Sequence, residues 1–201
     1  MISSFANQPL KQSHLTSDAQ QYTSEILRLF LQHLKRQDES CVLDAGPVID
    51  NNINFLARRV TKLFICDMLT RFKQHRQKHS PAKNVWQDLD YPDGQFDGIL
   101  LWNIIDHIEN RLVTELARIC SRMMKPKGLL MVIAQDVKNR SSRQTFFTIN
   151  ENSKLCEHPF PDAELPTYRR ENREIFSLME PLSSAKSYIY RNGSREHLFQ
   201  R

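Results

Sequence analysis

Four short apolar runs, each followed by an acidic or polar residue, constrain the fold of this chain more than any other feature. They are Cys41–Gly46, Leu63–Cys66, Gly98–Trp102 and Leu129–Ala134. Runs of this length with polar boundaries are typical of buried parallel strands. Segments with helical apolar spacing separate them, so strands and helices alternate along the chain. The sequence therefore predicts an α/β fold in which helices cover both faces of a doubly wound, mostly parallel sheet.

The spacing of apolar residues also places the helices. It predicts helices over residues 51–59, 68–79, about 110–124 and 170–179. A further helix is expected from Asp18, with Ser17 or Asp18 as its N-cap. A short extra strand is expected at Asn84–Asp88, between the second and third of the helices.

The C-terminal part of the chain departs from this alternation. Residues 145–160 are polar with aromatic interruptions, which indicates an inserted hairpin. Asn192-Gly193 is a strong hairpin-turn signal between two alternating segments at 186–190 and 197–199. The sequence therefore predicts an antiparallel C-terminal hairpin at the edge of the parallel sheet.

Length and composition favour one domain. The chain has 201 residues, of which 40% are hydrophobic and 25% charged, so it can form a packed core. We expect a flexible arm over residues 1–17 and a single domain over 18–201, with an insertion at about 136–168. No apolar run approaches the roughly 20 residues of a membrane span, and no secretory signal is evident.

The four cysteines lack the close spacing of zinc or redox motifs. We therefore expect four reduced thiols, no metal site and a cytoplasmic protein. The net charge of +5 permits an anionic partner but does not require one. Only five glycines occur, which disfavours a dinucleotide-binding protein because that fingerprint needs several in its first turn.

The order of elements and the residues at their ends resemble the class I S-adenosylmethionine-dependent methyltransferases. Val42-Leu-Asp-Ala-Gly46 is similar to the first motif, V-L-D-x-G-x-G-x-G, and Asp67 stands where the second motif has its acid. Residues 91–107 look like the fourth motif, and Met124–Leu130 resembles the turn before the fifth strand. The resemblance implies a seven-stranded, Rossmann-like methyltransferase fold whose last strand is antiparallel.

The resemblance also implies S-adenosylmethionine as cofactor and assigns residues to it. In the family, the acid at Asp67 takes both ribose hydroxyls, and the region of Asp88 contacts the adenine amino group. The residues expected to bind cofactor are Asp44, Gly46, Pro47, Asp67, Met68, Asp88, Leu89, Trp102 and Asn103. All lie at or just after predicted strand ends, where ligands of open α/β sheets bind. The alternative is that the acids cap the following helices and Trp102 fills core.

The first motif diverges in its second half. Val48 and Asp50 stand where the family has its second and third glycines. Glycines there let the backbone approach the ligand closely, and Asp50 would repel the cofactor carboxylate. Two hypotheses follow: a working methyltransferase, or a catalytically inactive methyltransferase-like protein that acts as a binding or regulatory partner.

Catalytic residues are harder to assign, because methyl transfer depends mainly on alignment of the reacting groups. His107 and Asp106 are weak candidates, since a histidine there could act as general base. The alternative is that either residue caps the next helix.

The acceptor is not identified by the sequence, and both small molecules and macromolecules remain open. The basic run 71–79 could dock an anionic partner such as nucleic acid, which nothing else in the sequence supports, or could be a solvated helix face. The insertion could bind the acceptor or a protein partner, and Arg169, Arg170 and Arg173 could hold an anionic acceptor or solvate a helix start.

Overall fold

The computed structural model describes residues 20–77, 85–135, 144–160, 165–191 and 193–201. Its main sheet has six strands in the order β3-β2-β4-β5-β9-β8. Their bounds are β2 Cys41–Asp44, β3 Lys62–Ile65, β4 Phe96–Trp102, β5 Met124–Gln135, β8 Ser183–Ile189 and β9 Ser194–Gln200. The first four strands are parallel, and β9 runs antiparallel to both β5 and β8. The predicted parallel sheet with an antiparallel C-terminal hairpin is confirmed.

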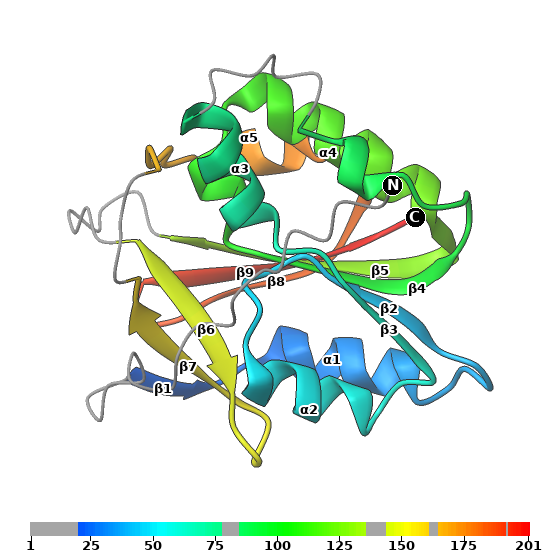
Figure 1. Cartoon of the computed structure of the whole chain (residues 1–201). Helices are drawn as coiled ribbons and strands as arrows, with labels where there is room; N and C mark the ends of the chain where they lie inside the picture. The colour runs from blue at the N-terminus through cyan, green and yellow to red at the C-terminus, as the bar shows by residue number, and fades with distance from the viewer. Residues whose placement is uncertain (1–19, 78–84, 136–143, 161–164, 192) are drawn as a thin grey trace.

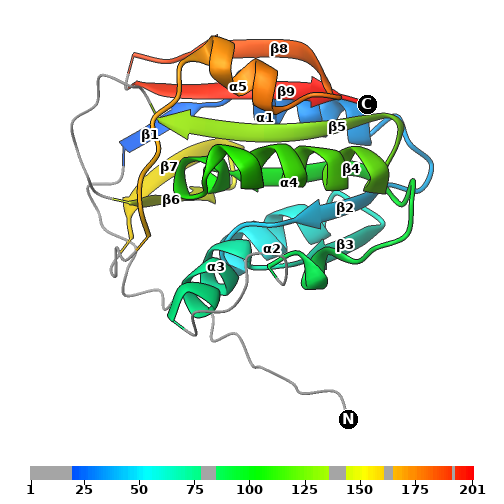
Figure 2. The same ribbon diagram turned by 90° about the horizontal axis from the view of Figure 1, so that it is seen from above.

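Helices cover both faces of this sheet, as predicted. Figure 1 shows α1 (Glu25–Leu34) and α2 (Asp50–Ala57) on one face. On the other face lie α3 (Met68–Gln77), α4 (Asn110–Met123) and α5 (Asn172–Leu178). Seen from above, α4 lies over β4 (Figure 2). The inner strands β2 and β4 are buried throughout, because helices remove both of their faces from water.

The prediction of a short strand at Asn84–Asp88, the third of seven along the chain, is wrong for the residues described, and the main sheet has six strands. Residues Gln87–Leu89 form a 3-10 turn, η3, and Asn84 lies outside the described ranges. The apolar side chains of this segment pack on the α4 side, where Trp86 Nε1 donates to Glu115 Oε2 over 2.9 Å. Leu89 is buried in the same cluster as Leu116. The segment therefore contributes to the core under α4.

The inserted hairpin is confirmed and is part of a second sheet. β6 (Thr145–Ile149) and β7 (Lys154–Pro159) are antiparallel, and β1 (Gln20–Thr23) pairs with the other edge of β7. The predicted helix start at Asp18 is therefore wrong. Helix α1 begins at Glu25, because the Ser24 hydroxyl accepts a hydrogen bond from the Leu27 N–H over 2.9 Å and caps it. Ser17 and Asp18 lie outside the described residues.

Two further predictions can be compared with the structure. All four cysteines are free and buried, as expected for reduced thiols, and Cys41, Cys66 and Cys120 belong to the hydrophobic core. None of the helices in the described ranges is long and apolar enough to cross a bilayer. The expected arm over residues 1–17 lies outside the described part of the chain.

Candidate functional site

The carboxyl ends of β2, β3 and β4 gather most of the predicted cofactor residues. Asp44, at the end of β2, is in register with Ile65 of β3 and Leu100 of β4. Asp67 follows β3 and Trp102 ends β4, so both lie at the same edge as Asp44. Strand order reverses at β2, since the chain moves to β3 on one side and returns to β4 on the other. Such a reversal is where open α/β sheets bind ligands.

Asp44 is held by groups of the chain itself. Its Oδ1 accepts the Gly46 N–H over 3.0 Å and the Trp102 Nε1–H over 2.6 Å. Burial raises the pKa of the Asp44 carboxyl to about 6, and these two hydrogen bonds oppose the rise. The carboxyl is thus oriented toward the loop that follows β2.

Trp102 covers this loop. A Cβ atom added to Gly46 would lie 2.3 Å from Trp102 Cδ1, so the indole rests directly on the glycine. Trp102 adopts a positive φ of 52°, which is uncommon for a bulky residue, and its ring stacks on Phe147 of β6. The side chain is only 2% exposed, and Gly46 and Pro47 are buried as well. Trp102 therefore fills space over the first-motif loop.

Asp67 acts as the cap of the next helix. Its carboxylate accepts the Thr70 N–H and the Thr70 hydroxyl, each over 2.9 Å, and the Val48 N–H over 3.4 Å. Burial raises the pKa of this carboxyl, while the hydrogen bonds from Thr70 and Val48 lower it. Met68 begins α3 and is fully buried. These are the contacts expected if Asp67 caps the helix that follows it, which was the alternative to cofactor binding.

The remaining predicted cofactor residues are divided between two places. Asp88 and Leu89 lie in η3, and Leu89 is buried in the core on the α4 side. Asn103 follows β4, and its Nδ2 donates to the Thr145 carbonyl of β6 over 2.8 Å. The Asn103 Oδ1 is buried and has no hydrogen-bond partner among the described residues. This oxygen is therefore a free acceptor at this edge of the sheet.

The two weak catalytic candidates lie in η4 (Ile104–His107), just beyond Asn103. His107 Nδ1 lies 3.2 Å from the Pro166 carbonyl, which can only accept, so we assign the ring proton to Nδ1. Its Nε2 then carries a lone pair, 3.5 Å from Asn103 Nδ2. Burial lowers the pKa of His107, which favours the neutral ring. In this tautomer Nε2 accepts the long hydrogen bond from Asn103 Nδ2, and it is the ring nitrogen that can accept a proton.

Asp106 faces a different part of the structure. Its Oδ2 accepts the Gln135 N–H over 2.8 Å, and burial raises the pKa of its carboxyl to about 7. The positive charges of Arg195 and Arg170 oppose that rise. Asp106 is 1% exposed and belongs to a buried polar cluster at the end of β5.

Two arginines complete this cluster. Arg170 donates to the carbonyls of Ile105 and Ile108 and to Asn110 Oδ1. Arg195 donates to the carbonyls of Gln135 and Arg170 and to Asn172 Oδ1. Arg170 therefore fixes η4 and the start of α4. Of Arg169, Arg170 and Arg173, which the sequence offered for an anionic acceptor, only Arg173 is exposed. A sequence shows only that Arg170 precedes a helix, because its acceptors are carbonyls more than 60 residues away.

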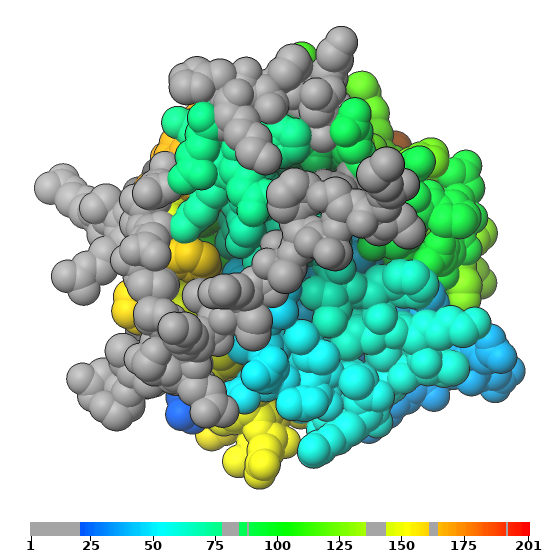
Figure 3. Space-filling model, in the orientation of Figure 1, coloured from blue at the N-terminus to red at the C-terminus, as the bar shows by residue number. Residues whose placement is uncertain are grey.

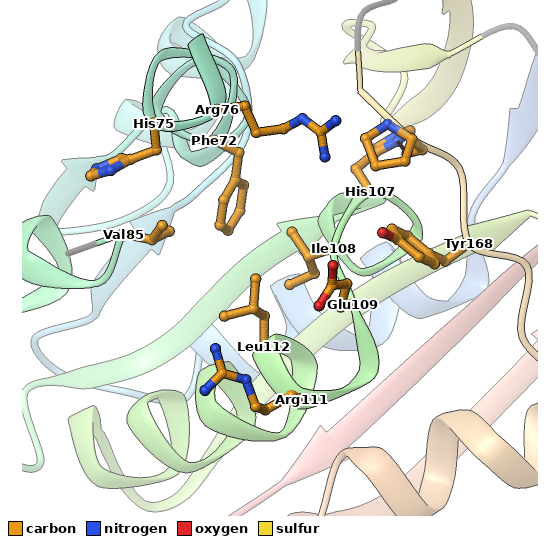
Figure 4. Close-up of a pocket in the computed structure, with 11 residues that line it drawn as sticks. Phe72, His75, Arg76, Val85, His107, Ile108, Glu109, Arg111, Leu112 and Tyr168 are labelled. Carbon is orange, nitrogen blue, oxygen red and sulfur yellow. Dashed lines mark hydrogen bonds between the residues drawn. The ribbon is translucent and has the colours of Figure 1, made fainter. Parts of the chain in front are cut away.

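A cavity of about 340 Å³ lies beside His107 (Figure 4). Its lining comes from α3, η4, α4 and the segment before α5. The lining residues are Phe72, His75, Arg76, Val85, His107, Ile108, Glu109, Arg111, Leu112, Pro166 and Tyr168. His107 is a predicted site residue, whereas the nine predicted cofactor residues do not line this cavity. Helical spacing placed Phe72 and Leu112 on helices, but only tertiary packing makes them face each other.

A methyltransferase-domain family model matches residues 14–173. An S-adenosylmethionine-dependent methyltransferase of Methanosarcina mazei is 13% identical with a TM-score of 0.55, covering 89% of this chain and 97% of its own. One from Mesorhizobium loti is 11% identical with a TM-score of 0.54, covering 87% and 95%.

A third structure contains ligands. It is the 1,6-didemethyltoxoflavin-N1-methyltransferase of Burkholderia thailandensis with bound 1,6-didemethyltoxoflavin and S-adenosylhomocysteine, 10% identical with a TM-score of 0.51, covering 88% of this chain and 78% of its own. At these identities the likenesses show the fold. No curated protein matches the chain. Since the family model spans well over half of the residues, this chain belongs to the methyltransferase-domain family.

Proposed function

We propose that this protein transfers the methyl group of S-adenosylmethionine to an acceptor. The observation that carries the proposal is the cluster of Asp44, Gly46, Asp67 and Asn103 at the strand-order reversal of a methyltransferase-family fold. Methyltransferase neighbours of similar fold, one with S-adenosylhomocysteine in its structure, support the same cofactor.

The donor and acceptor chemistry of the cluster fits this cofactor. Besides the carboxylate that Asp50 would repel, adenosylmethionine has an ammonium, a sulfonium and two ribose hydroxyls, which are cations and donors. The carboxylates of Asp44 and Asp67 and the unpartnered Oδ1 of Asn103 are acceptors. We propose that these three residues hold the cofactor, with Gly46 and Pro47 at its backbone contact. Met68, Asp88, Leu89 and Trp102 remain the other proposed cofactor residues.

A bound cofactor also needs space beside the loop that follows β2, and the Trp102 side chain occupies that space. The indole rests on Gly46 and hydrogen-bonds Asp44, so a ligand that approaches this loop must displace it. Cofactor binding is therefore coupled to movement of Trp102. The inactive alternative makes the opposite prediction, that Trp102 stays on Gly46 at every cofactor concentration.

Tryptophan emission tests this coupling. The chain has two tryptophans, and Trp86→Phe leaves Trp102 as the single reporter. Because Trp102 is 2% exposed, we expect emission typical of a buried indole that shifts to longer wavelength as S-adenosylmethionine is added. The matched control is Trp102→Phe, whose Trp86 emission shows how much of the wild-type response does not come from Trp102. Emission from Trp102 that is unchanged at saturating cofactor would contradict the coupling.

We propose His107 as the group that accepts the proton of the methyl acceptor. Its neutral ring presents Nε2 near Asn103 and lines the cavity beside η4. The rest of the catalytic contribution is alignment of acceptor and methyl group. A His107→Gln variant tests this role, because it should lower kcat while leaving cofactor affinity unchanged. Asp106 is buried in the arginine cluster, which supports a positioning role for it.

The domain organisation, the cellular location and the partner complete the proposal. We propose one domain over residues 18–201 with an insertion at about 136–168, to which β6 and β7 belong. The four free, buried thiols support a cytoplasmic location. The methyl acceptor is the partner that a methyltransferase requires, and nothing observed favours nucleic acid or a protein partner.

A further inference from the structure

The cavity beside His107 has apolar walls from three parts of the chain. Phe72 of α3, Ile108 before α4 and Leu112 of α4 line it, together with Val85. Figure 4 shows the Phe72 ring and the Leu112 side chain projecting into the same space from opposite elements. At about 340 Å³ the cavity lies at the lower end of the roughly 300–1,000 Å³ typical of small-molecule pockets. The walls suit one flat, apolar ring.

The polar part of the lining is mainly cationic. Figure 4 shows the Arg76 guanidinium extending from α3 across the cavity toward His107. Arg76 is exposed, and its side chain makes no hydrogen bond or ion pair with the described part of the chain. Lys73, one turn earlier, contributes positive charge near His107, and Arg76 also lines a second cavity with Lys73. A negative group on a ligand would find a cation with its donors available.

Two other charged residues line the cavity. Arg111 Nη1 lies 3.7 Å from Glu115 Oε1, so the positive charge of Arg111 is partly balanced. Glu109 is the one carboxylate among the lining residues and would disfavour an anion on its side. The favourable position for a negative group is therefore at Arg76, across the cavity from α4. Tyr168 adds a hydroxyl that Figure 4 shows turned into the cavity.

We propose that this cavity binds a small planar aromatic acid, with its ring between Phe72 and Leu112 and its anionic group on Arg76. The inference rests on the proposed function, because it takes this ligand to be the methyl acceptor. In that placement the anionic group and the adjoining edge of the ring lie on the side of the cavity where Arg76 extends toward His107 (Figure 4). A ring with a methylatable hydroxyl or ring nitrogen next to its acidic group meets these requirements.

The test uses two probes that differ in charge. 4-Hydroxybenzoate is a planar aromatic acid, and 4-hydroxybenzamide has nearly the same shape without the charge. We expect saturable binding of the acid to the full chain by calorimetry, and binding of the amide about tenfold weaker or worse, since a charge-assisted hydrogen bond is lost. Arg76→Gln should weaken binding of the acid by about tenfold and leave binding of the amide unchanged.

Two further variants complete the design. Arg58→Gln changes an exposed arginine that follows α2, on the face of the sheet opposite α3, and Figure 3 shows the surface of α2 (cyan) below that of α3, so binding should not change. Leu112→Phe adds bulk within the cavity and should weaken both probes. Equal affinity for the two probes, an Arg76→Gln variant that binds the acid like the wild type, or no saturable binding of either probe would each overturn the inference.

The probes are titrated without cofactor, so this inference and the proposed function can fail separately. Binding of the acid with no binding of S-adenosylmethionine would leave the cavity assignment and remove the methyl transfer. Binding of S-adenosylmethionine with no binding of either probe would leave the proposed methyl transfer standing and would overturn the cavity assignment.

Discussion

Replacing Arg170 with Met should lower the free energy of unfolding by about 3–5 kcal/mol, the cost of removing one partner from a buried charged network. The Arg170 side chain is 1% exposed and donates to two backbone carbonyls of η4 and the residue after it, and to Asn110 Oδ1. Met retains much of the volume but donates nothing, so two buried carbonyls and Asn110 Oδ1 lose their partner, and the Asp106 carboxyl loses a nearby cation.

Urea denaturation measures this effect as a lower urea concentration at the unfolding midpoint, with little change in the slope of unfolding free energy against urea concentration. The matched control is Arg173→Met, on the exposed surface of α5, which should change the unfolding free energy by less than about 0.5 kcal/mol. A loss below about 1 kcal/mol for Arg170→Met would contradict the role assigned to this guanidinium. Arg170→Lys should fall between the two, because a single ammonium cannot reach all three acceptors.

Replacing Asp106 with Asn should remove a pH dependence of stability. Burial raises the pKa of the Asp106 carboxyl to about 7, whereas in the unfolded chain it lies near 4. Between these values the folded state binds the proton more tightly, so stability from this group is present at low pH and is lost as pH rises toward 7. Asn is neutral throughout and can still accept the Gln135 N–H.

The stability of Asp106→Asn relative to wild type should therefore rise by roughly 3 kcal/mol between pH 4 and pH 7. Unfolding free energies measured for both proteins in the same buffers check this, and titrations of shared groups such as Asp44 cancel in the difference. A difference that does not change with pH, or that falls as pH rises, would show that Arg170 and Arg195 keep Asp106 ionised in the folded state.

The strands were predictable because buried parallel strands leave a strong local signal. The run Cys41–Asp44 has no polar residue before its final acid, and the structure buries all of it. The C-terminal hairpin was predictable for a similar local reason, since Gly193 takes a positive φ of 85° at the turn. The start of α1 was not predictable from spacing alone, because Tyr22 lies at helical spacing from Ile26 and yet belongs to β1, where pairing with β7 decides its conformation.

The candidate site was predictable only in part. Asp44, Asp67, Trp102 and Asn103 do meet at one edge, as strand ends require. The contacts of these residues were not predictable, because Trp102 on Gly46 and Thr70 on Asp67 depend on side-chain packing. The strand expected near Asp88 does not form, because Trp86 donates a hydrogen bond to Glu115 of α4, which lies 29 residues further along the chain. Residues of the cavity such as Arg76 carried no sequence signal beyond a basic helix.

Calorimetric titration of the full chain with S-adenosylmethionine, followed by S-adenosylhomocysteine, tests the proposed methyl transfer most directly. We expect saturable binding near one site per chain with a Kd on the order of micromolar, and a ligand-dependent rise in Tm. No binding at millimolar ligand, from a sample that unfolds cooperatively, would contradict the account and would mean that Trp102 closes the first-motif loop permanently.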